Sequence, residues 1–87
     1  MKQKSDDALS LTDIPGVGKS IADDFKQIGI KTINDLKDKN PEELYRLSNK
    51  KAGHIQDRCL LYVFRCAVYY AKGGRNPQKL KWWSWKD

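Results

Sequence analysis

The sequence predicts an all-α protein of about five helices, and three observations support this prediction. No stretch of the chain alternates between apolar and polar residues for long enough to form a strand. Apolar residues recur instead every three or four positions, which is the spacing of an amphipathic helix. Residues that favour the start of a helix, and glycines that favour its end, separate these segments. Because a chain of 87 residues holds one core at most, we expect a single domain over residues 1–87.

The N-terminal part predicts two short helices joined by a tight turn. Residues 1–7 are expected to be mostly flexible, and Ser5 can cap a first helix. The turn at residues 15–18 ends this helix, and a second one is expected at about residues 19–28. It should stop at Gly29, because glycine readily adopts the left-handed conformation that follows many helices. The apolar residues of the two helices are Leu9, Leu11, Ile21, Ala22, Phe25 and Ile28.

Two further helices are predicted from their first residues. Thr32 is placed to cap a short helix, and Asp35, three residues later, completes a capping box. Asn40 can cap another helix that begins with Pro41, since the fixed φ of proline suits the first helical position. This second pair has the size of the first pair but no Gly-x-Gly turn, so we interpret it as a degenerate copy. The residues expected to face the core are Ile33, Leu36, Leu44 and Leu47.

The fifth helix is expected to run from about Ala52 to Lys72, to end at Gly73-Gly74, and to form the centre of the core. Apolar residues lie on most sides of it, which indicates that other elements cover it from several directions. The tail, residues 75–87, holds three tryptophans. We expect at least two of their side chains to cover the central helix, while one can still stack on a ligand from the edge. The apolar residues of the predicted fifth helix that recur at helical spacing on one face are Ile55, Cys59, Val63, Cys66 and Tyr70.

The two cysteines are interpreted as small buried side chains in a reducing cytoplasm. Cys59 and Cys66 are seven residues apart on one helix face, which separates them by about 10 Å, too far for a disulfide. His54 lies off that face and no fourth ligand is evident, so no metal site is predicted. No group of residues has the pattern of a nucleophilic or acid–base centre. We therefore expect no cofactor and no enzymatic activity.

Charge is distributed unevenly along the chain. Residues 1–43 carry seven lysines and nine carboxylates, a net charge of −2, whereas residues 44–87 carry ten Lys or Arg and two Asp, a net charge of +8. A basic half of this kind favours a polyanionic partner, nucleic acid in the first place, and the alternative is a solvated lysine-rich surface. We recognise no signal peptide and no apolar run that could cross a bilayer. A cytoplasmic location without membrane contact is expected.

Residues 11–25, Leu-Thr-Asp-Ile-Pro-Gly-Val-Gly-Lys-Ser-Ile-Ala-Asp-Asp-Phe, carry the strongest functional signal. Gly16 and Gly18 flank one aliphatic residue and let the backbone approach a partner closely. Backbone N–H groups at Gly16, Gly18, Lys19 and Ser20, around the start of the next helix, are expected to be unpaired donors that suit an anion. A phosphate held there would fix position without reading sequence. The alternative is that these residues form only a tight turn between helices.

This segment resembles the helix-hairpin-helix motif of DNA repair proteins and X-family DNA polymerases. The resemblance implies that N–H groups at and beside Gly16 and Gly18 contact a DNA phosphate. It also implies that the hairpin can hold a monovalent cation on backbone carbonyls. The carbonyl groups that match this cation site are those of Thr12, Ile14 and Val17. The chain departs from the motif at Asp23 and Asp24, which stand where the motif often has basic residues.

Over nearly its whole length, the chain also resembles the pathogenicity-locus family of small bacterial helix-hairpin-helix proteins, some of which are described as mitomycin-resistance proteins. The segments that carry this resemblance are residues 14–18, 29–30, 41–45, 57–59, 63–65 and 82–86. Arg58 is a departure, because the family has proline at that position. The resemblance implies a tandem helix-hairpin-helix bundle of the SAM-like type with a long C-terminal helix.

These observations together predict a protein that binds the phosphate backbone of nucleic acid, DNA in the first place, without recognising a base sequence. A link to DNA repair or damage resistance is expected. The alternative is a protein–protein interaction module on the same scaffold, which Asp23 and Asp24 favour. The residues expected to hold the nucleic acid are Gly16, Val17, Gly18, Lys19, Ser20, Lys50 and Lys51.

Overall fold

The computed structural model describes residues 11–86, and within that range it contains helices and no strand, which confirms the all-α prediction. The first helix expected near Ser5 and the flexibility expected of residues 1–7 lie outside the described residues. The α-helices are α2 (Lys19–Gln27), α3 (Ile33–Leu36), α4 (Pro41–Ala52) and α5 (Arg58–Ala71). Three short 3-10 helices accompany them: η1 (Leu11–Asp13), η2 (Pro77–Leu80) and η3 (Trp82–Trp85).

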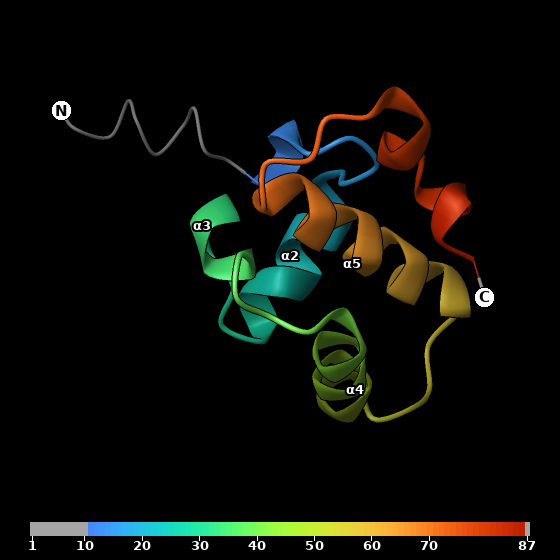
Figure 1. The fold of residues 1–87 in the computed structure, drawn as a ribbon. Coiled ribbons are helices and arrows are strands. Elements are labelled where there is room, and N and C mark those ends of the chain that lie inside the picture. Colours follow the sequence, from blue (N-terminus) through green and yellow to red (C-terminus); the bar gives the residue numbers. More distant parts are fainter. Residues whose placement is uncertain (1–10, 87) are drawn as a thin grey trace, which may run out of the picture.

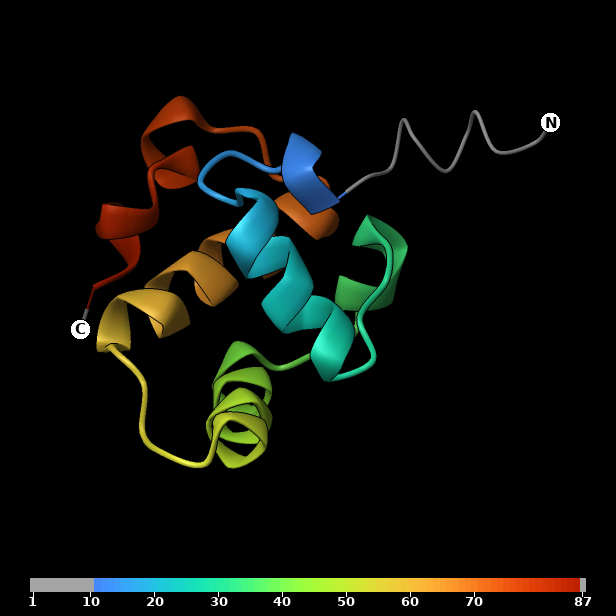
Figure 2. The same ribbon diagram turned by 180° about the vertical axis from the view of Figure 1, so that it is seen from behind.

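Helix α5 crosses the middle of the molecule and contacts α3, α4, η2 and η3. In Figure 1 it lies in front of α2, and in the reverse view of Figure 2 it lies behind α2, with α4 at the bottom in both views. The core is centred on Phe25 of α2 and Phe64 of α5, both fully buried, whose stacked ring centroids are 4.6 Å apart. Burial of two such rings is a large part of what a domain this small can gain from its core.

The ends of the short helices follow the sequence signals. Thr32 and Asp35 form the predicted capping box at the start of α3, each side chain accepting a hydrogen bond from the other residue's N–H. The N–H groups of Lys31 and Thr32 also hold the pKa of the Asp35 carboxyl below its ordinary value. Asn40 caps α4 as predicted, and its side chain accepts from the first-turn amides. Gly29, with φ of +90°, follows α2 as predicted.

Leu47 does not face the core, contrary to the prediction, because 37% of its surface is exposed. The buried residues of α4 are Leu44, Tyr45 and Ser48. Each residue advances about 100° around a helix, so Leu47 lies nearly a third of a turn away from the middle of that face. The prediction placed the buried face correctly at Leu44 and wrongly at Leu47.

The long fifth helix predicted from Ala52 is wrong at its start, because α4 continues to Ala52 and α5 begins only at Arg58. Gly53, with φ of +81°, ends α4, and the side chain of Asp57 caps α5. Ile55, predicted on the buried stripe, lies in the intervening loop and is 82% exposed.

Gln56 ties the loop between the two helices to the inner face of α4. Its backbone N–H donates to Asn49 Oδ1 at 2.9 Å, and its side-chain amide donates to Ser48 Oγ at 3.0 Å. Its carbonyl accepts a hydrogen bond from the hydroxyl of Tyr45. These bonds explain why a buried serine is tolerated in α4, since its hydroxyl has a partner.

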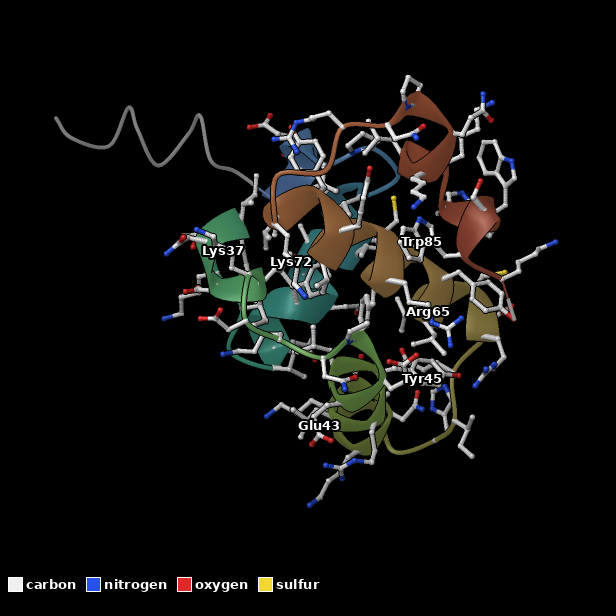
Figure 3. All side chains as sticks on the ribbon, in the orientation of Figure 1. Lys37, Glu43, Tyr45, Arg65, Lys72 and Trp85 are labelled. Atoms are coloured by element: carbon white, nitrogen blue, oxygen red, sulfur yellow. The ribbon has the colours of Figure 1, made fainter. Side chains whose placement is uncertain are left out.

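The C-terminal segment with η2 and η3 lies along α5. The guanidinium of Arg65 joins three elements: it donates to the Trp85 carbonyl at 2.7 Å and pairs with the Glu42 carboxylate of α4 at 2.8 Å. Figure 3 shows the labelled side chains of Arg65 and Trp85 near each other along α5. Cys66 is buried beneath the segment, with its Sγ 3.6 Å from the Lys79 carbonyl, and burial raises the pKa of its thiol. Cys59 is half-buried, and both thiols are free.

Candidate nucleic-acid interface

Apolar side chains that are buried in the core fix the turn between η1 and α2. Leu11, Ile14 and Val17 are all buried, at 4% exposure or less. The N–H of Val17 donates to the Ile14 carbonyl at 3.0 Å, so this amide is used inside the turn and offers nothing to a ligand. Gly16 has φ of +87°, a conformation that glycine adopts without strain. Val17 therefore contributes packing to the predicted site and not a donor.

Gly18 begins α2 as its N-cap and leaves a group of N–H donors open. Its carbonyl accepts the first helical bond, from the N–H of Ala22 at 2.9 Å, and it has no side chain to cap the helix. Among residues 11–86, none accepts a hydrogen bond from the N–H groups of Gly18, Lys19 or Ser20. All three residues are exposed. The positive end of the helix dipole and these donors together suit an oxyanion.

The two glycines of the turn have different surroundings. A Cβ placed on Gly16 would lie 3.4 Å from Cδ1 of Trp82, whereas one placed on Gly18 would meet no atom within 4 Å. Trp82 is half-buried against the core and stands beside Gly16, which is itself exposed, whereas nothing stands beside Gly18. Lys81, the residue before Trp82, is exposed. No sequence pattern linked Trp82 to Gly16, so sequence reasoning missed this contact.

Lys50 and Lys51 are not brought to the turn. They stand in the last turn of α4 and line a shallow hollow with Gln27 and Ile28, at the C-terminal end of α2. The turn is at the other end of this nine-residue helix, which is about 13 Å long. Both views show α4 on the opposite side of the molecule from the turn (Figure 1 and Figure 2). A phosphate contacted by Lys50 and Lys51 would therefore be a different one from that at the turn, and their contact with nucleic acid stays a prediction.

Two carboxylates lie one helical turn after the open donors. By helical spacing Asp23 is on the face of Lys19, and Asp24 is on the face of Ser20. Partial burial, and secondly the charge of Asp23, raise the pKa of the Asp24 carboxyl above its ordinary value. The charge of this surface is therefore mixed, with Lys19 opposed by at least one carboxylate.

The described residues offer little for other chemistry. Within residues 11–86 no group of three His, Cys, Asp or Glu side chains is placed to hold a metal ion, and no helix is long and apolar enough to span a bilayer. Of the carbonyls named for a monovalent cation, that of Ile14 already accepts the Val17 N–H and keeps a second lone pair. The cation on Thr12, Ile14 and Val17 stays a prediction.

Comparison with known proteins gives one family and one named relative. The profile of the family described as pathogenicity locus matches residues 4–87. The mitomycin resistance protein McrB of Streptomyces lavendulae is 39% identical over 79 residues, which cover 91% of this chain and 72% of the relative. No solved structure matches the chain significantly.

Proposed function

We propose, from the premise that this chain belongs to the pathogenicity-locus family, that it binds the phosphate backbone of nucleic acid without reading the sequence. DNA is the proposed ligand, and binding without catalysis is the proposed activity. The mitomycin resistance named in the S. lavendulae relative suggests that this binding contributes to damage resistance. We further propose that η1, the turn and α2 form a helix-hairpin-helix unit, with α3 and α4 as its degenerate copy.

The observation that carries the proposal is the open set of donors at Gly18, Lys19 and Ser20. Burial of Ile14 and Val17 fixes the turn, so the donors are held in place before a ligand arrives. Preorganised N–H groups lose little conformational entropy on binding an anion. Such a site takes a single phosphate and contacts no base edge, which accounts for the absence of sequence preference in the proposal.

Salt dependence of DNA affinity tests the proposal directly. Each phosphate that the protein neutralises releases counterions, so affinity is expected to fall roughly threefold per phosphate as salt rises from about 50 to 200 mM. The dependence of affinity on salt concentration can be measured by fluorescence anisotropy titrations of a labelled duplex and a labelled single strand at a series of salt concentrations. Absence of binding at low salt, or an affinity that does not change with salt, would contradict the proposal.

Removing the carboxylate one helical turn from Lys19 should tighten binding. Asp23→Asn is expected to raise duplex affinity about 1.5-fold to twofold at low salt, since like charges one helical turn apart interact by a few tenths of a kcal/mol. Asp38→Asn, at an exposed position outside the helices, is the control with the same change in net charge. Anisotropy titrations of both variants should separate a local effect from a global one. Equal gains in both variants would show that Asp23 does not face the DNA.

A protein-interaction module on the same scaffold is the second candidate. The paired carboxylates Asp23 and Asp24, and the exposed ring of Trp83, are the observations that favour it. Affinity capture with the tagged protein from nuclease-treated extract of its source organism would test this alternative. A stoichiometric protein partner, together with no binding to DNA, would replace the proposed function by this one.

A further inference from the structure

Trp83 is presented to solvent on a rigid support. Its surface is 53% exposed, whereas Trp82 and Trp85 are half-buried. Its ring meets the ring of Trp82 edge to face, with centroids 5.6 Å apart and an interplanar angle of 88°. The residues that follow are tied back to η2, because Ser84 Oγ donates to the Gln78 carbonyl and the Trp85 indole N–H donates to the Lys79 carbonyl, each at 2.7 Å. A large ring is thus held open without being part of the core.

The charge around this ring suits a polyanion. Residues 72–86 contain five Lys or Arg and no Asp or Glu. Lys81 and Lys86 flank η3 and are exposed. Two carboxylates approach this segment from other elements: Glu42 of α4 is paired with Arg65, and Asp57 at the start of α5 lies near Cys59, as does Lys86. Aromatic rings set among cations are the composition of surfaces on which nucleic-acid bases stack.

The same ring is connected to the phosphate-binding turn through one side chain. Trp82 lies between them, since it contacts Trp83 on one side and approaches Gly16 on the other. The Trp82 indole and the turn from Gly16 to Gly18 separate Trp83 from the donors, which is a short path on the scale of nucleic acid, in which successive bases rise by about 3.4 Å. A strand whose phosphate is held at the turn can therefore reach Trp83 within a few nucleotides.

Resting on the proposed function, we propose that Trp83 stacks on an unpaired base beside the phosphate held at residues 18–20. A base in an intact duplex has both faces covered by its neighbours, so this contact requires a gap, a flap or another single-stranded stretch next to duplex. The preferred ligand of the protein is then DNA in which single strand adjoins double strand.

The test compares an intact duplex with a duplex of equal length that has a short gap and carries the fluorescent base 2-aminopurine in it. The full-length protein is expected to bind the gapped DNA roughly tenfold more tightly and to quench the 2-aminopurine emission by stacking. Trp83→Ala should lose both the preference and the quenching while keeping its affinity for intact duplex, and Trp83→Phe should retain part of each. Leu47→Ala, which truncates another exposed apolar residue beside two lysines, is the matched control and should change neither.

Three results would overturn the inference. The first is that the wild-type protein binds the two DNAs with equal affinity. The second is that 2-aminopurine emission is not quenched in the wild-type complex. Neither of these results needs a variant. The third is a Trp83→Ala variant that keeps the preference for gapped DNA. Binding to intact duplex in any of these cases leaves the proposed function standing, whereas failure to bind either DNA removes both.

Discussion

Gly18→Asp is expected to weaken duplex binding at least tenfold, about 1.4 kcal/mol, and to leave the protein folded. The new carboxylate would stand at the N-cap of α2 and accept from the N–H groups that the proposal assigns to the phosphate. It would also repel the phosphate by its charge. The backbone at Gly18 has φ of −90°, which any residue can adopt, and a Cβ there meets no atom within 4 Å. Folding should therefore be unaffected or slightly favoured, since aspartate caps a helix better than glycine by a few tenths of a kcal/mol.

The control for this variant is Gln27→Glu, which adds the same charge at the other end of α2. Anisotropy titrations at one low salt concentration, with thermal unfolding followed by circular dichroism, would compare the two proteins. We expect Gln27→Glu to bind within about twofold of wild type, because its charge is about 13 Å along the helix from the donors and is partly screened. A Gly18→Asp variant that binds as well as Gln27→Glu would locate the DNA contact elsewhere.

Phe64→Ala should lower the free energy of unfolding by about 3–5 kcal/mol. Phe64 is fully buried in α5 and stacks on Phe25 of α2, so its removal leaves a cavity between the central helix and the helix that carries the donors. Small domains have only about 5–15 kcal/mol of stability in total, so much of the protein is expected to be unfolded at elevated temperature. Urea unfolding followed by circular dichroism would measure the change.

Ile55→Ala serves as the comparison, because this residue is 82% exposed in the loop before α5. Its substitution should change the unfolding free energy by less than about 0.5 kcal/mol. If residues 52–57 were instead helical, with Ile55 on the buried stripe, the loss would be on the order of 2 kcal/mol or more. The pair of variants therefore tests both the core and the position at which α5 begins.

Signals confined to a few neighbouring residues could be read from the sequence. The capping box of Thr32 and Asp35, the Asn40-Pro41 start of α4 and the stop at Gly29 each depend on contacts within about one helical turn. The apolar spacing in α2 and α5 likewise predicted the burial of Phe25, Val63 and Cys66. Such features are local and do not depend on how the helices pack.

The sequence-based predictions were wrong where two local signals pointed to different structures, or where the packing of helices determined the orientation of a residue. Gly53 and Asp57 are proper end and start signals, but the apolar spacing of Ile55 and Cys59 masked them. The exposure of Leu47 depends on which face of α4 packs against the core, and the sequence of α4 alone does not specify this face. The position of Lys50 and Lys51 relative to the turn, and the approach of Trp82 to Gly16, also depend on helix packing, and the sequence predicted neither of them.

The approach of Trp82 to Gly16 has a consequence for how the protein is made. The two residues are separated by most of the chain, so during synthesis the hairpin emerges from the ribosome long before the indole that lies beside it. Contacts between such distant positions are among the slower ones to form in folding. Until that indole arrives, the nascent hairpin lacks the neighbour that stands beside Gly16 in the finished protein.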